Sequence, residues 1–103
     1  MPGGPAERRL RLHRRAQAEL VEAADEYDRA RPGLGDEFTV LVEQAIESIL
    51  AAPQRWPLVD QRHRRYLLRR FPYSIFYRFD EAEIIVVAIA HRRRRPGYWS
   101  RRR

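Results

Sequence analysis

The longest apolar run of the chain lies near its C-terminal end. Residues 84–90 carry no charge and are rich in β-branched side chains, which is typical of a strand buried on both faces. Before this run, residues 73–79 place an aromatic or aliphatic side chain at every second position, and residues 80–83 form a short polar connection. The pattern predicts an antiparallel hairpin whose second strand is central in a sheet.

Two amphipathic helices are predicted upstream of this hairpin. From about Arg14, apolar side chains recur at helical spacing until the Pro-Gly pair at 32–33. A second apolar stripe starts at Phe38 and ends before Pro53, and Asp36 is a suitable N-cap for that helix. Because the link between them is short, we expect the helices to form an antiparallel pair.

Short strands are predicted on either side of the helices. Polar and apolar side chains alternate weakly over residues 7–12, which predicts a short strand before the helices. After the helices, the polar residues 59–65 are predicted to form a loop, and residues 66–70 a strand that ends before Phe71–Pro72. The predicted order is β-αα-βββ. This is an α+β fold in which a helical hairpin packs on one face of a small, mainly antiparallel sheet.

Composition indicates one small domain over residues 1–103, with only residues 1–6 and 100–103 flexible. Hydrophobic residues make up 44% of the chain, which argues against disorder. There is no cysteine, and the three histidines lack metal-ligand spacing, so we expect no metal or other cofactor. No segment has the length of a membrane span, and the N-terminus lacks the apolar part of a signal peptide. We therefore expect a cytoplasmic protein that does not contact membranes.

The positive charge is concentrated in the second half of the chain. All 21 basic residues are arginine, and the formal net charge is +7. Residues 1–52 hold 7 arginines and 10 acids, whereas residues 53–103 hold 14 arginines and 4 acids. The codon usage of a GC-rich genome explains the absence of lysine but not this distribution. The C-terminal half is therefore predicted to meet an anionic partner.

Several short motifs occur in a fixed order along the chain. They are Ala16-x-x-Glu-Leu20, Glu22-Ala23, Arg31-Pro-Gly-Leu-Gly35, Phe38, Ile49-x-x-x-Pro53, Arg70-Phe-Pro-Tyr73, Ile75-x-Tyr77, Ala88-Ile-Ala-His91 and Arg94-Arg-Pro-Gly-Tyr-Trp99. Together they resemble the RelE/ParE superfamily of type II toxin–antitoxin toxins, also called plasmid-stabilisation proteins, from about Leu10 to Trp99. The resemblance implies a compact microbial ribonuclease-like fold and a bacterial toxin held inactive by an antitoxin encoded beside it.

The resemblance leaves the target open. RelE-like members cleave mRNA in the ribosomal A site, whereas ParE-like members poison DNA gyrase. Our first hypothesis is a toxin that arrests growth by ribosome-dependent mRNA cleavage, without a metal. The alternative is a gyrase inhibitor with no catalytic activity, and a third hypothesis, from the charge alone, is a non-toxic nucleic-acid-binding module. The expected partners are the cognate antitoxin, in a hetero-oligomer, and either the ribosome with its mRNA or gyrase.

Candidate chemistry is concentrated after the predicted central strand. His91 is the one side chain there that titrates near neutrality, which makes it the best candidate for proton transfer. The arginines that follow could hold a phosphate, or they could form a solvated surface or a cradle for an acidic antitoxin. The candidate catalytic residues are His91 and Arg93, and the candidate nucleic-acid or target-binding residues are Arg65, Arg70, Arg92, Arg94 and Tyr98.

Structural alternatives exist for the other residues near this end. Trp99 is more consistent with packing than with base stacking, and Tyr98 fits either role. Arg69 and Arg70 occupy adjacent positions of a predicted strand, so only one of them can join the site. RelE-type nucleases usually carry an arginine in the middle strand, where the nearest residue here is the neutral Ser74. They also often use lysines before that strand, where this chain has only arginines.

Overall fold

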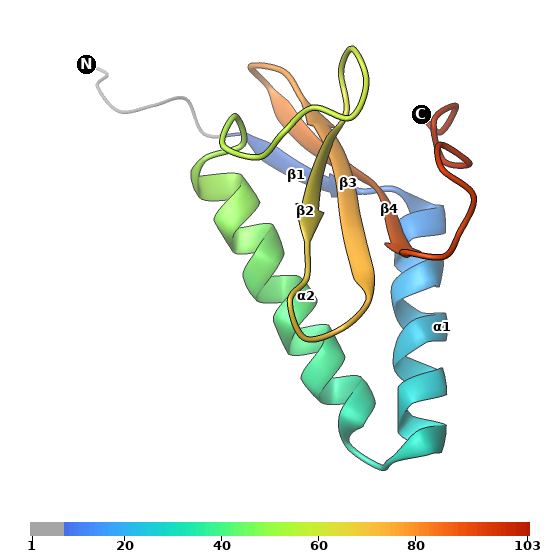
Figure 1. Cartoon of the computed structure of the whole chain (residues 1–103). Coiled ribbons are helices and arrows are strands. Elements are labelled where there is room, and N and C mark those ends of the chain that lie inside the picture. The colour runs from blue at the N-terminus through green and yellow to red at the C-terminus, as the bar shows by residue number, and fades with distance from the viewer. Residues whose placement is uncertain (1–7) are drawn as a thin grey trace.

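The computed structural model describes residues 8–103, and it has two helices packed on one face of a four-stranded sheet (Figure 1). The elements are β1 (Arg9–Leu12), α1 (Arg14–Ala30), α2 (Leu34–Ala51), β2 (Arg64–Leu67), β3 (Tyr73–Phe79) and β4 (Glu83–His91). This order confirms the predicted β-αα-βββ architecture. The predicted flexible residues 1–6 lie outside the described residues. No helix within residues 8–103 is long and apolar enough to span a membrane.

The last strand of the chain lies inside the sheet, whose order is β1-β4-β3-β2. β1 pairs with β4 in parallel, with Leu10 opposite Ile84, and the other pairs are antiparallel. Every residue of 84–90 is buried, which confirms the prediction from the apolar run. The β3–β4 hairpin brings Tyr73 opposite His91, and the register shift between Phe76 and Tyr77 leaves Val87 unpaired, which marks a bulge in β4.

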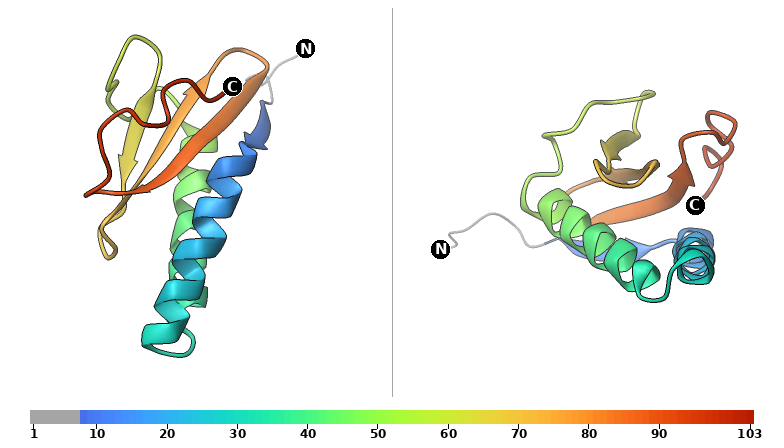
Figure 2. Two further views of the ribbon diagram at one scale, coloured as in Figure 1. Left: turned by 90° about the vertical axis from the view of Figure 1, so that its right-hand side faces the viewer. Right: turned by 60° about the horizontal axis from the view of Figure 1, so that its bottom comes forward.

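The core has two parts, one on each face of the sheet. The larger part packs α1 and α2 on the sheet around Phe38, Ile75 and Tyr77. The smaller part lies on the far face; its buried members are Ile85, Val87, Ala88 and Trp99, and Phe76 and Tyr98 pack against them. The C-terminal tail, residues 92–103, therefore covers the face that the helices leave open (Figure 2).

The second helix begins earlier than predicted, and its N-cap is not Asp36. Gly33 caps the helix with a φ of 90°, a left-handed conformation that glycine adopts without strain. The Asp28 carboxylate, from the end of α1, accepts the Gly35 N–H at 2.7 Å. Asp36 itself lies in the first turn, where a negative charge is favourable to the helix dipole.

The strand β2 is also displaced from the prediction, because it spans Arg64–Leu67 instead of residues 66–70. The Arg64 guanidinium donates to the carbonyls of Gln54 and Trp56 at 3.0 and 2.7 Å. These bonds accommodate a charged residue in a short edge strand. Residues 69 and 70 follow the strand, so the argument that they point to opposite faces of a sheet was wrong.

Candidate functional site

The residues after β4 form a turn at the end of the sheet. The Arg92 N–H donates to the carbonyl of Pro72 at 2.8 Å, and the Arg94 N–H donates to the carbonyl of His91 at 3.0 Å. Gly97, with a φ of 75°, then redirects the chain onto the far face of the sheet. The turn, the start of β3 and the end of β2 therefore enclose a common space.

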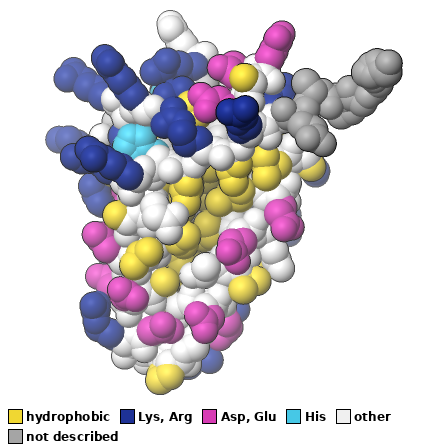
Figure 3. Space-filling view, turned by 180° about the vertical axis from the view of Figure 1, so that it is seen from behind, with side chains coloured by type: hydrophobic (Ala, Val, Ile, Leu, Met, Phe, Trp, Pro, Cys, Tyr) yellow, Lys and Arg dark blue, Asp and Glu magenta, His cyan; other side chains and the backbone are white. Residues whose placement is uncertain are grey.

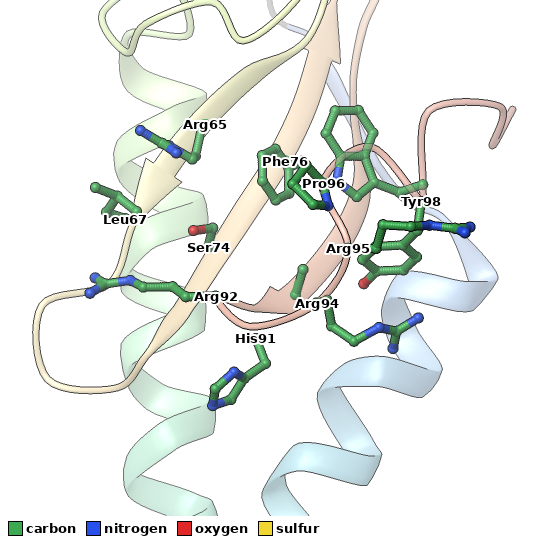
Figure 4. Close-up of a pocket in the computed structure, with 12 residues that line it drawn as sticks. Arg65, Leu67, Ser74, Phe76, His91, Arg92, Arg94, Arg95, Pro96 and Tyr98 are labelled. Carbon is green, nitrogen blue, oxygen red and sulfur yellow. The ribbon is translucent and has the colours of Figure 1, made fainter.

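That space is a pocket of about 230 Å³ (Figure 4). Five of the predicted site residues line it: Arg65, His91, Arg92, Arg94 and Tyr98. The other lining residues are Leu67, Ser74, Phe76, Ala90, Arg95, Pro96 and Trp99. Arg93 and Arg70, which were also predicted, do not line it. The pocket thus combines guanidinium groups with apolar and aromatic walls.

A backbone hydrogen bond determines which tautomer a neutral His91 ring takes. Its Nδ1 accepts the backbone N–H of Arg93 at 3.0 Å, so a neutral ring must carry its proton on Nε2. The ring also lies edge-on to Tyr73, with 5.2 Å between centroids. In Figure 4 the imidazole points away from Arg65 and Phe76. The lone pair that a general base would use is therefore already engaged.

The guanidinium groups around the pocket diverge. Arg92 donates to the carbonyl of Leu68 at 2.6 Å, on the side of the β2–β3 connection. Arg94 lies over the Tyr98 ring, 4.0 Å from its centroid. Figure 4 shows Arg92 and Arg94 pointing in opposite directions and Arg65 standing apart from both. A phosphate would not meet these three groups together.

Arg70 belongs to a different part of the surface. Its guanidinium lies 2.6 Å from a carboxylate oxygen of Glu37, in the first turn of α2. The hydrogen bond from Arg70 lowers the pKa of Glu37, and Arg31 contributes from the other side. Arg70 is therefore the arginine that pairs with the helices, one of the two roles considered for the 69–70 pair.

The two aromatic residues of the tail are used for packing. Trp99 is 4% exposed and stacks on Phe76, with 4.4 Å between centroids, which confirms the packing interpretation. The Tyr98 hydroxyl donates to Glu19 of α1 at 2.5 Å. Burial, together with that carboxylate, raises the pKa of Tyr98. Tyr98 therefore stays protonated and anchors the tail to the helix.

Glu19 organises this region, and although it belongs to the Ala16-x-x-Glu-Leu20 motif, the sequence suggested no role for it. β1 pairs only with Glu83 to Val86 of β4, so the edge of β4 is open beyond that point. Glu19 accepts the Ile89 N–H of this edge at 3.0 Å and also binds both terminal nitrogens of Arg102, at 2.8 and 3.1 Å. Arg102 in turn donates to the carbonyl of Val87 at 3.0 Å.

The Glu19 junction docks a segment that was predicted to be flexible. The side chains of Glu19 and Arg102 are only 14% and 12% exposed. The structure thus places the predicted flexible residues 100–103 on α1, with Arg102 as the anchor. These partners are 83 residues apart, and no local pattern in the sequence connects them.

His63 is a buried polar residue that the sequence analysis did not select. It is 2% exposed, and its Nδ1 lies 2.8 Å from a carboxylate oxygen of Asp60. Burial opposes ionisation of Asp60, but bonds from the N–H groups of Arg62 and His63 outweigh it, so the pKa of Asp60 is lowered. The His63 ring lies edge-on to Trp99 at 4.8 Å, which fixes the 58–63 loop beside the tail.

A second hollow, of about 310 Å³, lies on the α1 side of His91. Its walls carry the acids Glu19, Glu22 and Glu26 of α1, together with Tyr73 and His91. His91 therefore stands between a pocket lined by arginines and a hollow lined by carboxylates.

Comparisons with known proteins identify the family. Residues 10–96 match the family model described as the ParE toxin of the type II toxin–antitoxin system, parDE. The chain is 30% identical over 91 residues to Toxin ParE2 of Mycobacterium tuberculosis, in strains CDC 1551 / Oshkosh and ATCC 25618 / H37Rv, covering 87% of each chain. A solved structure of the chromosomal ParDE TA system from P. aeruginosa matches with a TM-score of 0.75 and 20% identity, over 84% of this chain and 97% of that chain. The chain therefore belongs to the ParE family of toxins from type II toxin–antitoxin systems.

Proposed function

We propose that this toxin arrests growth by binding DNA gyrase as a stoichiometric inhibitor, and that it does not cut RNA. The observation that carries the proposal is the state of His91, whose Nδ1 lone pair accepts a backbone N–H. Membership of the ParE family supports the same target, since ParE-like members of the superfamily poison gyrase. In the cell, the cognate antitoxin would hold the toxin inactive.

Metal-free RNA cleavage requires groups that this pocket does not assemble. It needs a base at the 2′-hydroxyl, cations that converge on the phosphate, and an acid for the leaving oxygen. Among the residues that line the pocket, His91 is the one imidazole, and the Nδ1 lone pair that a base would use already accepts the Arg93 N–H. Tyr98, with its raised pKa and its bond to Glu19, is poorly placed to supply the acid.

An inhibitor that acts by binding needs only a stable surface. The turn at 92–96 is exposed and carries four successive arginines, and hydrogen bonds to Pro72 and His91 fix its backbone. Trp99 and Arg102 hold the tail behind it. We propose that this turn contacts gyrase through its charge and shape, with His91 at its base.

The test uses a double variant that removes the predicted catalytic groups, His91→Gln with Arg93→Gln. The variant should fold, because Arg93 is exposed and His91 is only partly buried. We expect it still to arrest growth when induced without antitoxin, and to weaken inhibition of purified gyrase by no more than about tenfold, because three of the four arginines of the proposed contact remain.

Two readouts distinguish the alternatives in the same culture. Plasmid supercoiling reports on gyrase, and the integrity of a reporter mRNA reports on cleavage. Cut mRNA with unchanged supercoiling in the parent, and intact mRNA in the double variant, would overturn the proposal in favour of the ribonuclease hypothesis. The reverse pattern, with supercoiling lost and mRNA intact for both proteins, is the expected result.

A further inference from the structure

A second basic surface lies at the start of α1, away from the pocket. Figure 3 shows arginine side chains gathered around one histidine at the upper end of the molecule. Here the end of β1, the first turn of α1 and the C-terminal tail meet, because Arg11 donates to the main-chain oxygen of Arg103 at 2.8 Å. We call this surface the α1 basic end; its exposed members are Arg11, Arg14, Arg15, Arg101 and Arg103.

The charge of the α1 basic end is mostly uncompensated. Arg11 has a loose partner, since its Nε lies 3.6 Å from Glu83. Arg14, Arg15, Arg101 and Arg103 form no ion pair within residues 8–103. Arg14 and Arg15 moreover occupy the first turn of α1, which contains no acidic residue and where the helix dipole disfavours cations.

The pKa of His13, the N-cap of α1, responds to the positive electrostatic potential of these arginines. Burial and then the surrounding guanidiniums lower the pKa of its imidazole; those groups are Arg102, Arg11, Arg14 and Arg15. A positive potential that disfavours one more proton is the same potential that attracts an anion. The α1 basic end is therefore suited to a polyanion.

The α1 basic end is separate from the pocket beside His91. Leu12, at the end of β1, pairs with Val86 of β4, five residues before His91. At the rise of a strand, this places the two sites about 17 Å apart. A ligand at the α1 basic end therefore need not compete with a protein bound at the 92–96 turn.

The composition of the surface points to a nucleic-acid backbone. A protein interface normally has an apolar or aromatic centre, whereas the nearby aromatic residues Tyr98 and Trp99 are committed to Glu19 and Phe76. Recognition of single strands and of RNA loops requires free aromatic rings for stacking. Contacts to the backbone of duplex DNA require only cations.

We propose that the α1 basic end binds the phosphate backbone of duplex DNA. The contact is independent of sequence, because guanidiniums that reach phosphates carry no base readout. It would bring the toxin onto DNA independently of which target the 92–96 turn recognises. The proposal does not depend on the assignment of gyrase.

The test measures binding of a fluorescent duplex of arbitrary sequence to the full-length toxin at several salt concentrations. The variant Arg14→Gln with Arg15→Gln removes two phosphate contacts. Its affinity should fall by about 60-fold at about 0.1 M salt, and its slope of log K against log salt should decrease in magnitude by about 1.8. The variant should remain folded, because both arginines are exposed and glutamine is a good helix former.

The matched control is Arg29→Gln with Arg69→Gln, which has the same net charge but alters exposed arginines elsewhere. This control should retain the affinity of the parent within about twofold. Equal loss of affinity in both variants would overturn the proposal, because net charge alone would then explain binding. Tighter binding to a single strand of the same length, or stronger competition by poly-glutamate than by duplex DNA at equal charge, would also overturn it.

The His13 imidazole provides a local readout by NMR. Phosphates bound at the α1 basic end should neutralise the surrounding guanidiniums and raise the pKa of His13 towards its ordinary value. The same addition of duplex DNA to the Arg14→Gln, Arg15→Gln variant should have a smaller effect. DNA binding that leaves the His13 titration unchanged in the parent would place the DNA elsewhere and contradict the proposal.

Discussion

The Glu19 junction gives a quantitative prediction of how the C-terminal tail is held. In Glu19→Ala, the Arg102 guanidinium, the Tyr98 hydroxyl and the Ile89 N–H all lose their common acceptor. Removing one partner of a fully buried ion pair costs about 3–5 kcal/mol. Because these side chains are 14% and 12% exposed and the tail can detach into water, we expect the lower end, about 3 kcal/mol.

This loss is large relative to the stability of a domain of this size, which is about 5–15 kcal/mol. The melting temperature should fall by roughly 12 °C or more. Urea denaturation of Glu19→Ala, Arg102→Ala and the double variant should give a coupling energy of about 2 kcal/mol. Glu22→Ala, an exposed acid on the same helix, is the control and should change stability by less than about 0.5 kcal/mol. A coupling energy near zero would refute the role assigned to the junction.

Three further changes test other parts of the structure. Gly35→Ala should destabilise the fold by about 2 kcal/mol or more in thermal denaturation, because its Cβ would lie 2.3 Å from the Ala24 carbonyl oxygen; a stable variant would show that the helices can separate without cost. Val87→Asp should fail to fold in circular dichroism, since Val87 is fully buried and an unpaired carboxylate there costs several kcal/mol. Protonated His13 cannot accept the Arg15 N–H. Because the pKa of His13 is lowered in the folded protein, the unfolded chain takes up this proton at a higher pH than the folded chain does. Stability should therefore decrease as the pH falls through and below 6.5, and His13→Asn, which keeps a cap, should remove that part of the pH dependence.

The elements that could be predicted are those whose pattern follows from burial. Residues 84–90 are apolar at every position because both faces of β4 are covered, and residues 73–79 alternate because the helices cover one face more fully than the tail covers the other. Breakers such as Pro32 and Pro53 marked the ends of the helices closely. The motifs were sufficient to recognise the RelE/ParE superfamily, and the match to the ParE family model then identified the branch that the motifs had left open.

What could not be predicted depends on contacts between distant residues. The polar sequence around Arg64 predicts a loop, and only its hydrogen bonds to the carbonyls of Gln54 and Trp56 explain its place in β2. The tail looks like a run of solvated arginines, and its anchoring by Glu19 arises from the open edge of β4. His91 has the expected position, but its tautomer is set by a backbone N–H, which composition and spacing do not reveal.

The place of β4 in the sheet also determines when the toxin can form. β4 lies between β1 and β3, so it joins the first strand of the chain to the others, yet it is the last strand to be synthesised. A ribosome that has made residues 1–82 has produced both helices and three strands, but the strand that connects them is still missing. Pairing of Leu10 with Ile84 also closes a long loop, which slows folding. We therefore expect that the nascent chain cannot form the folded toxin until translation is almost complete.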